Sequence, residues 1–314
     1  MLNKIYFEIS KIRIFEETLS KYYKYQNMRS PIHLSIGQEL SPSIFSQLVT
    51  PKDKIFSTHR NHAHYLAFGG SINDILLELY SRAGGPTDGR GGSMHLFHKN
   101  KNLMLSSPIV GSSIPIGVGY ALSEKISNKD SISIIYLGEA ATEEGAFHES
   151  INLSTTFQIP VLFICENNFF SVYTHIKDRQ KKINKNYENF YGIKEFKIKT
   201  GNILKNLSVS KNAFEYVKKS KKPAILNLNT YRFIEHCGPH QDDHLNYRNK
   251  NEQQFWKKQD PLINIKKYLN KSNLIKIDKK IEIFNNEIIK KFKKFEKTNS
   301  NIVNKFKKID IYAK

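Results

Sequence analysis

Cysteine is scarce in this chain: its 314 residues include only Cys165 and Cys237. Two thiols are too few for the disulfide framework of a small secreted domain. They also lie far apart in the sequence, without the close spacing that a zinc site needs. Neither disulfides nor a cysteine-bound metal is therefore expected to hold the fold together.

Long hydrophobic runs are missing as well. No stretch of about 20 apolar residues is present to span a bilayer, and no N-terminal stretch has the apolar core of a signal peptide. We therefore expect no membrane partner and a cytoplasmic location. The length and the 39% hydrophobic content are enough for a sizeable core. With no repeat or clear linker, we interpret residues 1–314 as a single domain with a helical tail at about 260–314.

Acidic residues are few, with 29 Asp and Glu against 49 Lys and Arg, which gives a formal net charge of +20. Such an excess is compatible with a nucleic-acid-binding protein. However, the lysines are densest after Lys250 and are spread through amphipathic segments rather than placed between exposed aromatic residues. We therefore interpret them as a solvated surface and expect no nucleic-acid partner. A basic nucleic-acid binder and an inactive scaffold are the non-enzyme alternatives.

Hydrophobic periodicity predicts an α/β protein. Apolar residues recur at helical spacing near the N-terminus, and a second apolar stripe runs from Ile281 to Phe295. Continuous apolar runs of strand length occur in the middle of the chain. Helices are predicted at 4–27, 72–82, within 106–126 and at 142–158, strands at the start of 53–70 and at 131–138, 159–168 and 223–233, and loops at 83–95 and 178–190.

The segment "IIYLGEAATEEGAFHESINL" (134–153), with the run "IPVLFICENN" (159–168), reads as strand, helix and strand. Such a βαβ unit requires parallel strands, and ligands bind at the carboxyl ends of parallel strands. Glu139 and Asn168 follow these two ends, so we expect them to converge. A carboxylate and an amide oxygen suit Mg²⁺ or Ca²⁺. The small Ala140 and Ala141 would let a diphosphate reach the N–H groups that start the next helix.

Taken together, these motifs resemble a known family. An acid and two small residues after a strand, followed about thirty residues later by Asn-Asn, resemble the thiamine diphosphate fingerprint. The surrounding blocks resemble the α subunit of the decarboxylating first component of 2-oxo acid dehydrogenases, and they keep that family's order along the chain. These blocks are "THRNH" (58–62), "GRGGSMH" (89–95), "PIVGSSIPIGVGYAL" (108–122), "EEGAFHESINL" (143–153), "TYRF" with "EHCGPH" (230–240) and the terminal "DIYAK".

The resemblance implies a thiamine-diphosphate-binding fold, a parallel sheet flanked by helices, and it implies cofactor ligands. Arg60 would bind the diphosphate, and its planar guanidinium suits that task. His59 stands at a second diphosphate position, where the family usually has Tyr. Val110 would face the aminopyrimidine ring through its backbone, and Pro108 stands beside it where Gly is common.

The same resemblance assigns the metal and the proton-transfer groups. Glu139 and Asn168 would bind Mg²⁺ through their side chains, and Phe170 would bind it through its main-chain carbonyl. Ala140 and Ala141 would line the diphosphate. The candidate catalytic residues are His33, on the substrate side, and His236, in a loop that reaches the reacting centre. His62 and His95 are weaker candidates.

Two departures from the family pattern bear on substrate and control. Glu139 stands where the pyruvate branch usually has Asp, although the branched-chain branch is known with Glu. In "IEHCGPH", Cys237 replaces the serine that regulatory kinases modify in mitochondrial relatives.

The implied reaction is the oxidative decarboxylation of a pyruvate-like or branched-chain 2-oxo acid with thiamine diphosphate and Mg²⁺. The acyl group would pass to the lipoyl group of a partner acyltransferase. The glutamate that activates the cofactor belongs to a β subunit in this family, so we expect an α₂β₂ heterotetramer with the site between chains. An acetoin dehydrogenase, or another thiamine-dependent acyloin or aldehyde-transfer enzyme, is the alternative on the same scaffold.

Overall fold

A parallel β-sheet forms the centre of the computed structural model, which describes residues 1–98, 100–181 and 186–297. The six strands follow the order β2-β1-β3-β4-β8-β7, and every neighbouring pair is parallel. A two-stranded antiparallel ribbon follows β4. The strands are β1 (Lys54–Ser57), β2 (Leu103–Ser106), β3 (Ser133–Gly138), β4 (Val161–Asn167), β7 (Lys194–Ile198) and β8 (Ala224–Asn229), with β5 (Phe170–Ser171) and β6 (Thr174–His175) in the ribbon.

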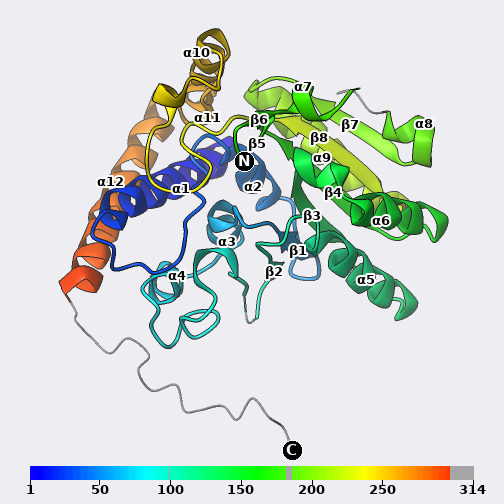
Figure 1. Cartoon of the computed structure of the whole chain (residues 1–314), viewed down its shortest axis with the longest axis horizontal. Coiled ribbons are helices and arrows are strands. Elements are labelled where there is room, and N and C mark those ends of the chain that lie inside the picture. The colour runs from blue at the N-terminus through cyan, green and yellow to red at the C-terminus, as the bar shows by residue number, and fades with distance from the viewer. Residues whose placement is uncertain (99, 182–185, 298–314) are drawn as a thin grey trace, which may run out of the picture.

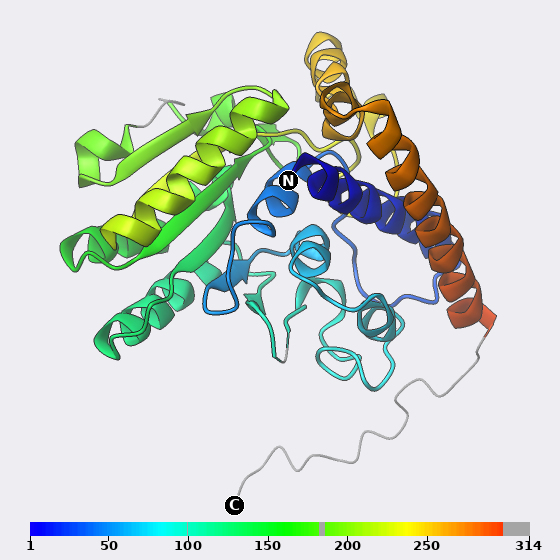
Figure 2. The same ribbon diagram turned by 180° about the vertical axis from the view of Figure 1, so that it is seen from behind.

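Both faces of the sheet are covered, which explains why the strands read as continuous apolar runs. On β3, Ile134 and Tyr136 pack into one core, whereas Ile135 and Leu137 pack into the other. The helices α5 and α6 lie beside one face and α1, α3 and α9 beside the other, as Figures 1 and 2 show. The confirmed fold class is therefore α/β, a parallel sheet between layers of helices.

Twelve helices connect and cover the strands in the described part of the chain. They are α1 (Leu2–Tyr23), α2 (Leu40–Phe45), α3 (His62–Ala67), α4 (Ile72–Leu79), α5 (Ser113–Ile126), α6 (Gly145–Thr156), α7 (Ile176–Arg179), α8 (Tyr187–Tyr191), α9 (Ile203–Ser220), α10 (Lys250–Lys258), α11 (Pro261–Asn264) and α12 (Lys271–Lys297).

The predicted C-terminal helical segment is confirmed as far as Lys297. Helix α12 packs against α1, and the rings of Phe15 and Phe292 lie 5.8 Å apart between centroids. Residues 298–314, including the "DIYAK" block, lie outside the described residues, so a single domain over the whole chain stays a prediction. Within the described helices, none combines the length and the apolar character needed to cross a membrane.

Several elements escaped the sequence-based prediction, among them the strands β2 and β7 and the long helix α9. The two strands lie at opposite edges of the sheet, where one side of the backbone has no neighbour and strands are often short and polar. The predicted loop at 178–190 was also wrong in part, because it contains the end of α7 and the start of α8, while residues 182–185 lie outside the described part.

The helix after β3 begins later than its sequence indicates. A 3₁₀ turn at Glu139–Glu143 comes first, and α6 starts at Gly145 with Glu144 as its N-cap. Thr142, where the predicted helix starts, donates from its hydroxyl to the Glu139 carbonyl at 2.6 Å. Glu139 and Glu143 therefore lie before the first turn of α6, and their side chains contact other parts of the chain.

The chain order places a ligand crevice beside β1 and β3. Strand β2 lies on one side of β1. The next strand in the sequence, β3, lies on the other side of β1, and β4 follows beside β3. Ligands in open parallel sheets bind at the carboxyl ends of the strands where this reversal occurs. The segments that follow β2, β1, β3 and β4 all meet at that edge.

Candidate active site

A cavity of about 210 Å³ lies at the carboxyl ends of these four strands. Apart from the two weaker candidates His62 and His95, its lining includes every residue assigned above to catalysis, cofactor or metal. These residues are His33, His59, Arg60, Pro108, Val110, Glu139, Ala140, Ala141, Asn168, Phe170 and His236. The structure thus brings all eleven together around one space, while their individual roles stay a prediction.

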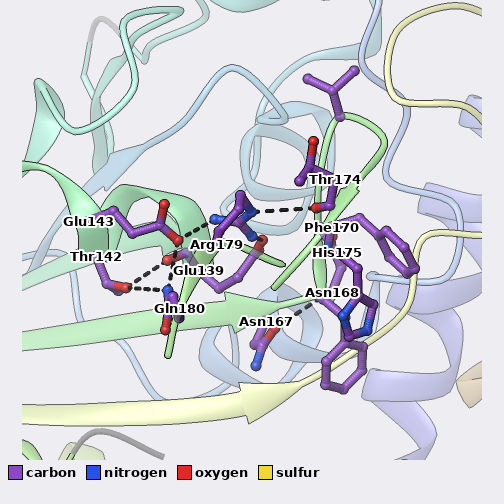
Figure 3. A network of polar contacts seen from close by, with 12 residues as sticks. Glu139, Thr142, Glu143, Asn167, Asn168, Phe170, Thr174, His175, Arg179 and Gln180 are labelled. Carbon is purple, nitrogen blue, oxygen red and sulfur yellow. Dashed lines mark hydrogen bonds and ion pairs between the residues drawn. The ribbon is translucent and has the colours of Figure 1, made fainter. Parts of the chain in front are cut away.

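Glu139 is buried at the cavity and already has a cationic partner. The residue is 4% exposed, and its carboxylate accepts a hydrogen bond from Nη2 of Arg179 at 2.6 Å. The same guanidinium contacts Glu143, whose carboxylate also accepts from the Gln180 amide at 2.8 Å (Figure 3). Burial raises the pKa of Glu139, and the Arg179 charge opposes that rise. Arg179 thereby favours an ionised carboxylate at the cavity wall.

A tight turn after β4 sets the other proposed metal ligands. Gly138 pairs in register with Glu166, so the chain that follows β3 lies beside the chain that follows β4. The side-chain oxygen of Asn168 accepts from the Phe170 N–H at 3.1 Å, and this turn leads into the β5–β6 ribbon (Figure 3). Phe169, between them, has a left-handed φ of 71°. Asn168 and Phe170 are therefore held in the same turn.

Arg60 brings a buried positive charge to the cavity. Its guanidinium donates to the Leu34 carbonyl at 2.7 Å and to the His236 carbonyl at 3.0 Å. Burial and the neighbouring Arg232 lower the pKa of Arg60 to about 9. A guanidinium whose hydrogen bonds reach carbonyl groups lacks the counter-charge that normally accompanies a buried ion. The arrangement is suited to receiving an anion.

Three imidazoles surround this guanidinium. The ring centroids of His33 and His59 lie 4.7 Å apart, those of His33 and His236 5.1 Å, and those of His59 and His236 5.5 Å. Burial and the charge of Arg60 lower the pKa of His33 to about 2 and those of His59 and His236 to about 3. All three rings are therefore neutral near pH 7, and each offers one N–H donor and one acceptor nitrogen for hydrogen bonds.

The two weaker histidine candidates do not line this cavity. His62 is fully buried and bridges Glu16 at 3.0 Å and Ser93 at 2.8 Å, an internal network that ties α1 to the glycine-rich loop. His95 is exposed and contacts the Gly91 carbonyl at 2.7 Å. A catalytic role for either residue stays a prediction.

Sequence reasoning missed two groups at the site. Arg179 comes forty residues after its partner Glu139, and no local pattern indicates the pairing. Glu166 lines the cavity, and its buried Oε1 has no hydrogen-bond partner among the described residues. Glu166 lies two residues before Asn168, at the end of the same predicted strand, and this position could have indicated that its side chain reaches the site.

Comparison with known sequences identifies close relatives. The family described as "Dehydrogenase E1 component" matches residues 8–302. The chain is 33% identical over 264 residues to "Pyruvate dehydrogenase E1 component subunit alpha" of Rickettsia bellii, covering 83% of this chain and 80% of the relative. It is 30% identical to the protein of the same name from Rhizobium meliloti, covering 88% and 81%. The somatic mitochondrial form of Bos taurus is 31% identical, with 89% and 71% covered.

Solved structures share the fold at much lower identity. A transketolase from Campylobacter jejuni superposes with a TM-score of 0.57 and 17% identity over 93% of this chain. A transketolase mutant from Pichia stipitis gives a TM-score of 0.55 and 18% identity over 92% of this chain. The chain spans about half the length of these transketolases, at 48% and 46%. This likeness supports the fold class.

Proposed function

Because the chain belongs to the Dehydrogenase E1 component family, we propose that it is the α chain of an enzyme that decarboxylates pyruvate with thiamine diphosphate and Mg²⁺. Its relatives place it among the oxidoreductases of the 2-oxo acid dehydrogenase family, so the expectation of an enzyme is confirmed. Pyruvate is the substrate that the names of those relatives indicate.

One observation carries the proposal: a single cavity is lined by a buried carboxylate, Glu139, and a buried guanidinium, Arg60. A metal–diphosphate group has a cation and an anion to match these two charges. Helix α5 adds to the anion-binding character, because its first residues Ser113 and Ile114 line the cavity and a helix N-terminus favours negative charge. The helix expected to supply this end, α6, begins at Gly145, beyond the lining residues.

The donor set fits the proposed groups. Carboxylate and amide oxygens such as those of Glu139 and Asn168 are ligands that Mg²⁺ accepts, and the Phe170 carbonyl belongs to the same turn. Arg60 would hold the diphosphate, with His59 beside it and with Ala140 and Ala141 leaving room at the backbone. The exposed Val110 would present its backbone to the aminopyrimidine ring, next to Pro108.

The histidines would handle protons. When bound, thiamine diphosphate supplies the nucleophilic carbon and the electron sink that decarboxylation requires. A neutral ring of His33 or His236 would donate a hydrogen bond to the substrate carboxylate, and it would take up a proton once a bound anion offsets the charge of Arg60 that holds its pKa low. His33 Nδ1 is buried without a hydrogen-bond partner among the described residues, so it is available for such a contact.

The rim of the cavity supports a partner chain. Ile109, Val110 and Val172 line the cavity and are nonetheless 69%, 48% and 41% exposed. Exposed apolar residues around a polar site are typical of a surface that another chain covers. We propose that a β subunit covers this rim in an α₂β₂ heterotetramer and supplies the activating glutamate, and that a lipoyl acyltransferase takes the acyl group. Cytoplasmic location stays a prediction.

The test is activity of the α chain with and without a β-like partner. The two chains are co-purified and assayed with a panel of 2-oxo acids and an artificial electron acceptor, with thiamine diphosphate and Mg²⁺ added or withheld. We expect turnover of pyruvate that requires both chains and both added components. Turnover by the α chain alone would contradict the shared site, and a preference for a branched 2-oxo acid would contradict pyruvate as substrate.

A further inference from the structure

The helices on the two sides of the sheet differ in their lysine content. On one side, α9 has four lysines among its 18 residues. On the other side, α5 and α6 together have one, Lys125, although Lys and Arg make up 49 of the 314 residues of the chain. Neither residues 102–124 nor residues 131–176 contain any Lys or Arg. A lack of lysine is expected for the buried strands of this region, but not for helices whose outer faces are exposed.

Large apolar side chains are exposed on the outer faces of α5 and α6 instead. Ile116 and Ile126 of α5 are 50% and 73% exposed, while Leu153 of α6 and Phe157 at its C-cap are 38% and 55% exposed. The two helices lie side by side against the same core (Figures 1 and 2). We call these four residues, together with the exposed Gly119, the α5–α6 face. An exposed apolar surface without lysine has the composition of the centre of a protein–protein interface.

The few charged residues of these two helices leave the face close to neutral. Lys125 donates from Nζ to the carbonyls of Phe157 and Gln158 at 2.5 and 3.1 Å, so its charge lies at the C-terminal end of α6, which favours a cation. Glu124 of α5 is buried, and Glu149 is the one acid of α6. The α5–α6 face therefore lacks the positive charge that covers much of the chain.

We propose that the α5–α6 face binds the same face of a second copy of this chain. Each copy carries a net charge of +20, and such a charge opposes association over long range. Two copies therefore repel each other least where neither presents lysines. A partner of low or opposite net charge would not require a lysine-free surface, so this composition favours a like-charged partner. A two-fold symmetric contact, in which the same residues meet from both sides, is the commonest way for identical chains to pair.

This contact goes beyond the proposed function and lies away from the surface assigned to the β subunit. That surface is the rim of the cavity, formed by Ile109, Val110 and Val172 at the carboxyl ends of the strands. Ile126 and Phe157, in contrast, lie at the far ends of α5 and α6. Two copies of the chain should therefore pair without a β subunit, and this pairing would supply the contact between the α chains of an α₂β₂ heterotetramer.

The test is sedimentation equilibrium of the purified full-length chain over a range of concentrations, in which we expect a reversible dimer. A Cβ added at Gly119 would meet no heavy atom of another part of the chain within 4 Å, so Gly119→Arg should fold normally. The substitution would bring an arginine from each copy into the contact, and the dissociation constant of the dimer should rise at least about thirtyfold. Added salt should strengthen the dimer of the unaltered chain, because the screening length falls to about 3 Å at 1 M salt and the repulsion between the copies is then largely removed.

Matched variants separate this contact from association through another surface. Ser208→Arg places the same charge on the exposed side of α9 and should leave the dissociation constant unchanged. Leu153→Lys provides a second variant, on α6, if Gly119→Arg fails to fold as judged by circular dichroism. A dimer that persists unweakened in a folded Gly119→Arg or Leu153→Lys chain would overturn the proposal, as would a dimer that salt weakens or an unaltered chain that stays monomeric. A dimer with the expected responses supports the contact even if the two-chain enzyme fails to turn over pyruvate, which would count against the proposed function alone.

Discussion

The two charged groups at the cavity differ in how their charge is balanced. Glu139 has a counter-ion, because Arg179 contacts its carboxylate at 2.6 Å. Arg60 instead donates to the Leu34 and His236 carbonyls, and burial together with Arg232 depresses its pKa. A metal ion that binds Glu139 would therefore have to replace the guanidinium of Arg179. An anion that binds Arg60 would instead neutralise a positive charge that has no counter-ion.

This difference explains how one cavity can select a metal–diphosphate group. An anion can bind the guanidinium of Arg60 without displacing a carboxylate. A cation, in contrast, has to compete with Arg179 for the carboxylate of Glu139. Anion affinity should therefore respond mainly to Arg60, and metal affinity to the Glu139–Arg179 pair. Substitutions at these residues would separate the two roles.

The largest effect is expected on turnover when His236 is changed to Ala. Removing a positioned proton-transfer group should lower acyl transfer to lipoyl by roughly 10²–10⁴-fold. Because Arg60 and Glu139 remain, thiamine diphosphate should still bind within a few-fold. Steady-state assays of the two-chain enzyme, paired with calorimetry, measure both quantities, and full turnover by the variant would show that the loop around His236 is structural.

Arg60→Ala should show the reverse pattern, with cofactor affinity lost first. Removing one partner of a buried charge pair costs about 2–5 kcal/mol, which corresponds to at least a thirtyfold weaker affinity for thiamine diphosphate. Calorimetric titration of the assembled enzyme gives the value. Equal losses of cofactor affinity in the Arg60 and His236 variants would remove the distinction between anion binding and proton transfer.

A smaller effect is expected at Arg179. Arg179→Gln removes the guanidinium that competes with Mg²⁺ for Glu139, so the metal should bind about tenfold more tightly, a change of about 1.4 kcal/mol. Arg179→Lys keeps the charge and is the matched control, with an affinity close to that of the unaltered chain. Mg²⁺ titration of cofactor binding decides the sign. Weaker Mg²⁺ binding in the Gln variant would mean that Arg179 positions Glu139 instead of competing for it.

The smallest effect concerns stability and pH. The folded pKa values of His33, His59 and His236 lie near 2–3, below the unfolded value of about 6.5. Between pH 3 and pH 6.5 the unfolded chain binds more protons than the folded chain. The free energy of unfolding therefore falls as the pH drops below about 6.5. At pH 6.0 the loss relative to high pH is about 0.8 kcal/mol for each imidazole. In urea unfolding, the free energy of unfolding of His59→Phe should fall less steeply with falling pH than that of the unaltered chain. An unchanged slope would mean that other groups than His59 cause the pH dependence.

Much of the site was accessible from the sequence because it is built on local signals. Glu139 and Asn168 each follow an apolar run of strand length, and parallel strands bring such ends together. Family resemblance supplied His33, His59 and His236, which no local periodicity would have connected. The edge strands β2 and β7 were missed because short, partly exposed strands lack the apolar run that identifies β3 and β4.

Long-range electrostatic pairing was the part that sequence could not supply. The Arg179–Glu139 contact depends on a 3₁₀ turn delaying the start of α6 and on the β5–β6 ribbon leading the chain into α7. The proximity of the imidazoles depends on three segments separated by strands and helices. Each feature is a property of tertiary packing, which spacing along the chain does not encode.

The most direct test of the account is whether cofactor binding requires a metal ion through Glu139. Calorimetric titration of thiamine diphosphate into the assembled two-chain enzyme, with Mg²⁺ present or chelated, should show tight binding only with Mg²⁺. Glu139→Ala should lose that dependence and bind weakly in both conditions, because the charged metal ligand is gone. An unchanged, Mg²⁺-dependent affinity in Glu139→Ala would contradict the assignment of the cavity.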